Sequence, residues 1–222
     1  MVGFAVAEKK TNFTKKLMAK KITLLSYLSL SLFGFLMGRV VILDFLNPFS
    51  LGLLCASMIN GVNVLIVALS LLLGAFSINN SEILLWHLFT VTALLLFYFI
   101  FNRTRVKKKI LFSILGPTIS FGAGFFIFYI RDYYLYDMLM LLMQSIMICA
   151  LTNIYDKGLP LLTGFKKRMV LSTEEMISAS ILITSLFLGP SIYIWKFSIK
   201  NIISIFLIFI FSYVGGIGVG TA

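Results

Sequence analysis

The chain has 222 residues, of which 60% are hydrophobic and only 12% are charged, and its mean hydropathy is +1.03. Soluble domains carry about a quarter charged residues, so this composition excludes an ordinary water-soluble protein and favours one embedded in lipid. The net charge of +11 does not indicate nucleic-acid binding, because lysine and arginine collect on the cytoplasmic loops of membrane proteins and no basic stretch here alternates with base-stacking aromatics.

The apolar runs are long and lack the alternation of barrel strands. They predict an all-α fold, a polytopic bundle of about seven or eight transmembrane helices. A basic leader at residues 1–21 precedes the multi-span domain at residues 22–222, and we expect the N-terminus on the cytoplasmic side. The runs fall near residues 22–43, 46–60, 62–78, 83–101, 110–130, 138–155, 176–195 and 202–222.

The first run contains two glycines and an arginine whose positions indicate contacts with other helices. Gly34 and Gly38 are one helical turn apart on the same face, where small residues allow two helices to approach closely. Packing within one bundle is favoured over packing between copies. Arg39 lies near the outer end of the run. It is either an anchor between helices, with Asp44 as a partner, or a side chain that snorkels to the interface.

The second run is short for a straight span. Pro48 opens it, and Asn60 and Gly61 close it with residues typical of turns. It is a short or tilted span, a re-entrant segment, or a piece merged with its neighbour. The charge rule favours a crossing, because only then do the leader and the basic stretches at residues 102–109 and 156–175 share the cytoplasmic side.

The single histidine, His87, lies in the fourth run. A proton relay with Glu82 is one hypothesis, and a histidine at the level of the lipid headgroups is the favoured one. The spans lack the buried charges that ion-coupled transporters use. Both cysteines lie inside apolar runs and are expected to be small buried residues.

An acidic stretch precedes the seventh run. Ser172 and Glu175 have the spacing of a capping box, and Glu174 and Glu175 suit the positive end of a helix. A docking role for this acidic pair is secondary.

Glycines recur in the last run, where their spacing again predicts close helix packing. No strand precedes them, so they do not form a dinucleotide-binding loop. These glycines are Gly215, Gly216, Gly218 and Gly220.

Three stretches in this order resemble a known family. They are Gly34–Leu43 with the following Pro48-Phe49, the pair Glu174-Glu175 before an apolar run, and the closing Tyr213–Gly218. Together they are similar to the N-terminal membrane domain of the stage II sporulation protein E family. The resemblance covers most of the chain, although each stretch alone is weakly specific.

The resemblance implies a bacterial, multi-pass membrane anchor at the asymmetric sporulation septum, with possible self-association and contact with the division machinery. It also implies a metal-dependent serine phosphatase of the 2C type elsewhere in the full-length family, which would use manganese or magnesium. The sequence ends at Ala222 without such a domain, so we expect a fragment or a shortened relative. This chain is then non-catalytic, without cofactor or metal, with the lipid bilayer rather than nucleic acid as its partner.

Two other functions stay open. A small membrane transporter, or the substrate-binding membrane subunit of one, would use short broken spans near Pro48 and Gly215–Gly220. A membrane enzyme such as an acyltransferase ranks last, because it needs a nucleophile and base that His87 alone does not supply.

Overall fold

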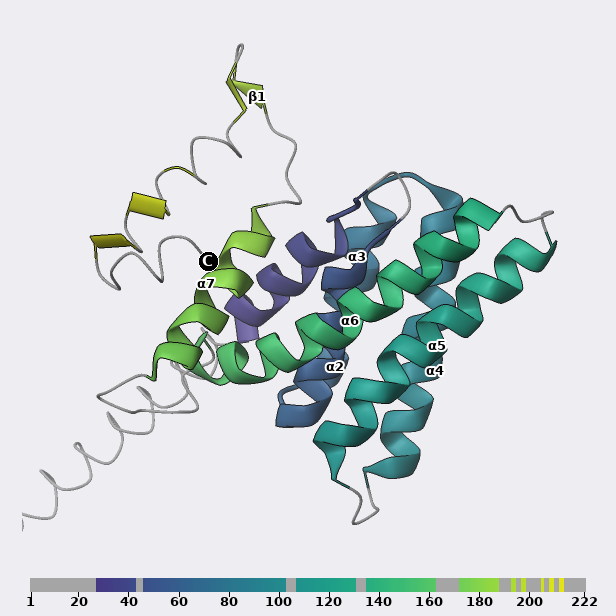
Figure 1. The fold of residues 1–222 in the computed structure, drawn as a ribbon, viewed down its shortest axis with the longest axis horizontal. Coiled ribbons are helices and arrows are strands. Elements are labelled where there is room, and N and C mark those ends of the chain that lie inside the picture. The colour runs from purple at the N-terminus through teal and green to yellow at the C-terminus, as the bar shows by residue number, and fades with distance from the viewer. Residues whose placement is uncertain are drawn as a thin grey trace, which may run out of the picture.

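The computed structural model describes residues 27–42, 46–102, 107–130, 135–162 and 172–187, with short pieces at 193–194, 197–198, 205, 208–209 and 212–213. These residues form a helical bundle (Figure 1), which confirms the predicted all-α membrane fold. The leader at residues 1–21, Asp44 and the predicted packing residues Gly215, Gly216, Gly218 and Gly220 lie outside the described residues.

The helices differ in length. The first described helix is Tyr27–Gly38; it is followed by α2 (Pro48–Asn60), α3 (Val64–Phe76), α4 (Ser81–Phe101), α5 (Lys108–Ile130), α6 (Leu135–Leu162) and α7 (Thr173–Leu186). Among the described residues, α4, α5 and α6 are long and apolar enough to cross a membrane, whereas the first helix, α2 and α3 are shorter. Large apolar side chains on their outer faces are exposed, as expected of surfaces that meet lipid; examples are Leu69, Leu96, Phe126 and Ile146.

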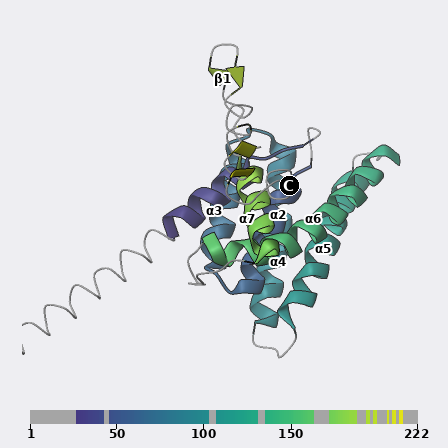
Figure 2. The same cartoon turned by 60° about the vertical axis from the view of Figure 1, so that its left-hand side comes forward.

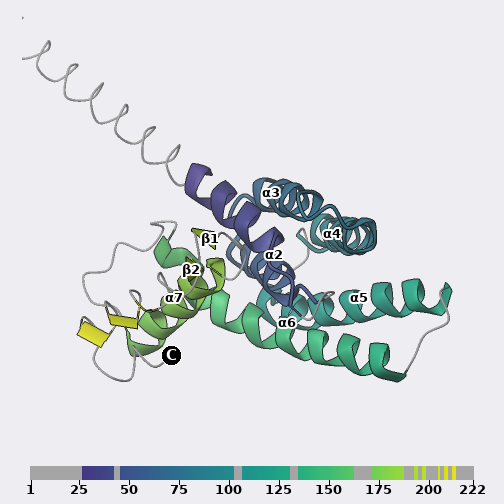
Figure 3. The same cartoon turned by 90° about the horizontal axis from the view of Figure 1, so that it is seen from above.

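Helix α2 lies at the centre of the bundle. Every residue from Pro48 to Met58 is buried, and the view from above places α2 between α3 and α4 on one side and α5 and α6 on the other (Figure 3). Asn47 caps the helix: its Oδ1 accepts from the Ser50 N–H at 3.2 Å, and its Nδ2 donates to the Gly38 carbonyl at 3.0 Å. The predicted opening by Pro48 and closure by Gly61, at a φ of 67°, are confirmed.

The first helix packs closely against α3, as the two glycines predict. Gly34 lies against Ser70, and Gly38 lies against Leu71 and Gly74, so that an added Cβ would overlap a neighbouring atom at either glycine. The contacts advance in the same direction along both helices, so the two helices run parallel. Helix α2 therefore returns the chain to the end where the first helix began, which is what a crossing by the second run requires. The close approach occurs within one chain.

Helix α6 contacts α2, α5 and α7 more extensively than other helices contact one another. Figures 1 and 2 show α5 and α6 side by side. They are antiparallel: Gly116 lies opposite Ile148, and Gly124 lies against Leu141. Gly52 allows α2 to approach α6 closely, since a Cβ at this position would come within 2.9 Å of the Leu151 Cβ.

Two predicted boundaries are wrong. Helix α6 does not stop near residue 155 but continues to Leu162, because Gly158 packs directly on α7, where an added Cβ would lie 2.9 Å from the Ser178 carbonyl oxygen. The seventh run is not helical to its end either: β1 (Tyr193–Ile194) pairs antiparallel with β2 (Phe197–Ser198).

Candidate functional site

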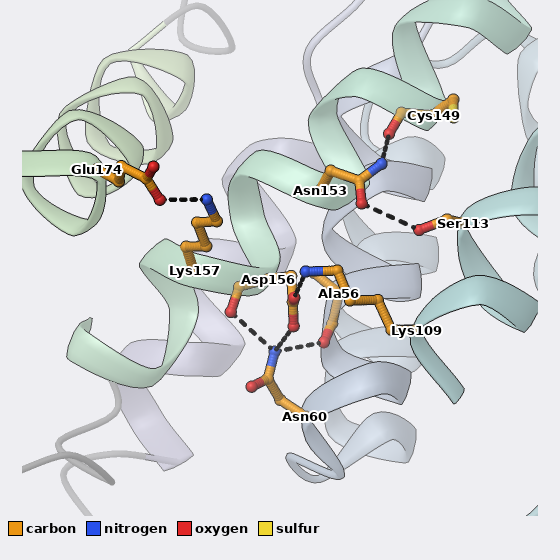
Figure 4. A network of polar contacts seen from close by, with 9 residues as sticks. All are labelled: Ala56, Asn60, Lys109, Ser113, Cys149, Asn153, Asp156, Lys157 and Glu174. Carbon is orange, nitrogen blue, oxygen red and sulfur yellow. Dashed lines mark hydrogen bonds and ion pairs between the residues drawn. The ribbon is translucent and has the colours of Figure 1, made fainter. Parts of the chain in front are cut away.

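Charged and amide side chains meet at one end of the bundle, around Asp156 on α6 (Figure 4). The Asp156 carboxylate is 2.9 Å from the Lys109 Nζ at the start of α5. The Asn60 Nδ2, at the end of α2, donates to the Asp156 Oδ1 at 3.1 Å and approaches the Asp156 carbonyl at 3.3 Å. The Asp156 side chain is 14% exposed and that of Lys109 is 52% exposed. One carboxylate thus ties three helices together.

The next residue of α6, Lys157, contacts α7 rather than α2 or α5. Lys157 forms an ion pair with Glu174 at 2.5 Å, in the first turn of α7. The hydrogen bond from Lys157 and its positive charge lower the pKa of Glu174. This pair is exposed and adds little stability. We call Asn60, Lys109, Asp156, Lys157 and Glu174 the α6 junction.

The predicted capping box at the start of α7 is confirmed. The Ser172 Oγ accepts from the Glu175 N–H at 3.3 Å, and the Glu175 Oε2 accepts from the Ser172 N–H at 3.1 Å. Glu174 and Glu175 therefore both have structural roles, and the docking role of the acidic pair stays a prediction.

A second layer of polar contacts joins α5 and α6 one turn deeper in the bundle. The Ser113 Oγ donates to the Asn153 Oδ1 at 3.3 Å, and the Asn153 Nδ2 donates to the Cys149 carbonyl at 2.9 Å. Figure 4 shows this layer beside the α6 junction. Interhelical hydrogen bonds of this kind favour one rotational register between two membrane helices.

The structure bears on one of the two interpretations of Arg39. Its side chain is exposed at the end of the first helix, which agrees with snorkelling, whereas an anchor between helices needs a buried guanidinium. Its proposed partner Asp44 lies outside the described residues.

His87 is buried inside the bundle and not exposed on its surface, and its level relative to the lipid headgroups stays a prediction. The side chain is 1% exposed and meets the edge of the Trp86 ring, with centroids 4.8 Å apart. The reason is its place on the buried face of α4, which also carries Thr90 and Leu94. Glu82, the proposed relay partner, is exposed in the first turn of the same helix.

Sequence reasoning missed the central residues of the α6 junction. Asp156 and Lys157 were expected in a cytoplasmic loop, and Asn60 was expected only as a turn residue. No local signal marks them, because their partners lie on other helices; Asn60 and Asp156 are 96 positions apart.

Among the described residues, several buried polar atoms lack a hydrogen-bond partner, and three of them belong to two side chains of α5 and α6. Both amide atoms of Gln144 on α6 and the Ser120 Oγ on α5 are in this state, and the two residues are 0% and 1% exposed. Elsewhere in these helices, buried hydroxyls such as that of Thr152 donate to the carbonyl one turn earlier.

Replacing Gln144 with methionine should stabilise the protein by about 1 kcal/mol, because it removes a buried amide that gains no hydrogen bond. Thermal unfolding in detergent measures this change. Asn153→Leu is the matched control on the same helix and should destabilise, since Asn153 is bonded to Ser113 and Cys149. Equal losses in both variants would mean that Gln144 has a bound partner after all.

The described residues do not fit the manganese or magnesium that the family's phosphatase implies. Within the described ranges, no three His, Cys, Asp or Glu side chains come close enough to hold a metal ion. The carboxylates that are described are distributed over α4, α6 and α7, and Asp156 is already bound to Lys109. No step of metal chemistry is assigned to these residues.

Comparisons with known proteins agree with the sequence resemblance. The sequence profile of the family described as "SpoIIE, N-terminal domain" matches residues 3–222. Stage II sporulation protein E of Bacillus subtilis (strain 168) is 28% identical over 195 residues, which are 84% of this chain and 23% of that protein. The chain therefore spans less than a quarter of the length of this relative. No solved structure matches.

Proposed function

Because this chain belongs to the family of SpoIIE N-terminal domains, we propose that it anchors a longer sporulation protein in the bacterial membrane and positions it there through interactions of its own. The chain itself does no chemistry in this proposal. By family resemblance, the enzymatic activity is that of a metal-dependent serine phosphatase. It belongs to a soluble domain in another part of such a protein. Its place would be the asymmetric septum, near the division machinery.

The observation that carries the proposal is the contrast between the two kinds of surface on the bundle. The flanks of α4, α5 and α6 expose large apolar side chains, which suits a lipid environment. One end collects the ionic contacts of the α6 junction. Since α6 is held to α2, α5 and α7 at that end, the bundle supplies a fixed platform beneath an attached soluble domain.

A domain exchange in Bacillus subtilis tests both halves of the proposal. The matched region of its stage II sporulation protein E is replaced by this chain, and in a parallel strain by an unrelated membrane domain with as many spans. Fluorescent fusions and alkaline extraction of membranes report location. We expect both chimaeras in the membrane fraction, and only the one with this chain at the septum.

The outcomes separate anchoring from positioning. If both chimaeras locate to the septum, the anchoring role stands and the proposed positioning through interactions of this chain is contradicted. Release of the first chimaera by alkaline extraction would contradict anchoring itself. A soluble metabolite that raised the unfolding temperature of the purified chain would instead favour the transporter alternative.

A further inference from the structure

A groove of about 530 Å³ runs along the outer surface between α5 and α6. Its rim residues Ile114, Leu142 and Ile146 are each roughly half exposed or more. The groove is lined by Ser113, Ile114, Pro117, Thr118, Phe121, Leu142, Ser145, Ile146 and Cys149.

The hydroxyl groups in this groove have no free donor to offer a ligand. Ser113 donates to Asn153, Thr118 donates to the Ile114 carbonyl at 3.0 Å, and Ser145 donates to the Leu141 carbonyl at 2.9 Å. The remaining lining is aliphatic, aromatic or sulfur-containing. The groove therefore suits an apolar occupant.

One end of the groove leads to a basic patch. Lys109, Ser113 and Pro117 follow at single-turn intervals on α5, so they lie along one stripe of the helix. Lys107 and Lys108 precede Lys109 in the chain, and the first turn of α5 contains no acidic residue. The Lys108 Nζ lies 6.0 Å from the centroid of the Tyr98 ring on α4, so this ammonium is on the α4 side of the helix.

The charges that face this patch do not neutralise it. Asp156 of α6 engages Lys109, and the neutral Asn102 accepts from the Lys108 Nζ at 2.7 Å. The start of α5 thus carries three lysines, one of them paired with Asp156, at the N-terminal end of a helix, which itself attracts anions.

We infer that α5 and α6 bind an anionic phospholipid, with an acyl chain in the groove and the phosphate at the lysines of α5. The basic patch and the apolar groove follow one another along α5, in the order of a lipid's headgroup and tail. A second protein helix would fill the groove without any need for the charge at its end. The inference rests on the membrane location in the proposed function, but not on the positioning role.

Lipid binding to the purified protein tests this inference. The protein is delipidated in detergent and then given phosphatidylglycerol or phosphatidylcholine with identical acyl chains. Native mass spectrometry counts the bound lipids, and thermal unfolding reports their effect. We expect phosphatidylglycerol to bind more tightly and to raise the unfolding temperature further.

Two variants test the apolar groove and the basic patch separately. Ser145→Phe fills the groove and should weaken binding of both lipids, whereas Leu96→Phe, on the exposed face of α4, is the matched control and should not. The double variant Lys107→Gln and Lys108→Gln should reduce the preference for phosphatidylglycerol by roughly 30-fold. Lys109 is left unchanged because it holds Asp156.

Three results would overturn the inference. They are equal affinity for the two lipids, unchanged lipid binding by Ser145→Phe, and an unchanged preference in the lysine variant. Disulfide cross-linking of two copies through Ile146→Cys in membranes would assign the groove to a second copy of this chain instead.

Discussion

Replacing Gly38 with leucine is expected to destabilise the bundle by about 3 kcal/mol or more, because the new side chain has no room. Even a Cβ at this position would overlap the Leu71 carbonyl oxygen and come within 3.1 Å of the Gly74 Cα. Both obstacles are backbone atoms of α3, so no side-chain rotation relieves the overlap. The first helix and α3 must separate, and they lose their packing along the parallel contact.

Thermal unfolding in detergent measures this loss, with Gly122→Leu as the matched control. Gly122 is also in an apolar helix, but nothing lies within 4 Å of a Cβ placed there, so its substitution should change stability by less than about 0.5 kcal/mol. Gly74→Leu should behave like Gly38→Leu, since its Cβ would overlap the Phe35 carbonyl oxygen. Equal unfolding temperatures for the Gly38 and Gly122 variants would refute the close packing.

Replacing Asp156 with alanine is expected to cost about 2 kcal/mol. The change leaves the Lys109 ammonium and the Asn60 amide without their shared acceptor. A fully buried ion pair broken in this way costs about 3–5 kcal/mol, but Lys109 is half exposed and regains water, which reduces the loss. Lower stability should appear as a lower unfolding temperature and as easier proteolysis at this end of the bundle.

Two control substitutions separate charge from hydrogen bonding in the α6 junction. Asp156→Asn keeps an oxygen acceptor for Asn60 and should recover part of the loss. Glu174→Ala removes the exposed pair with Lys157 and should cost less than about 1 kcal/mol. A larger loss in Glu174→Ala than in Asp156→Ala would contradict the central place of Asp156.

The sequence predicts the local features of this fold well. Pro48 and Gly61 bound α2 as their turn chemistry indicates, and Ser172 with Glu175 forms the expected capping box. The spacing of Gly34 and Gly38 predicts close helix packing, and the structure adds the partner, α3. The helix ends and the capping box depend on interactions within a few residues, so a single segment contains the information. The glycine spacing shows that a close approach is allowed, but it does not identify the partner helix.

The features that the sequence did not reveal depend on contacts between distant segments. Asp156 follows an apolar run and looks like the first residue of a loop, but the packing of Gly158 on α7 extends the helix beyond it. The burial of His87 has the same origin, because the face of α4 that turns inward is decided by its neighbours. Hydropathy locates a span along the chain but does not determine its rotation about its own axis.

The burial of α2 from Pro48 to Met58 has a consequence for how the protein is made. A helix of 13 residues extends about 20 Å, whereas the hydrocarbon core of a bilayer is about 30 Å thick. The neighbours that enclose α2 include α5 and α6, which the ribosome synthesises later. Until α6 has entered the membrane, α2 lacks the protein surface that surrounds it in the finished bundle. We therefore expect stable insertion of the second helix to wait for the sixth, and a nascent chain released between them to be cleaved more readily by membrane proteases.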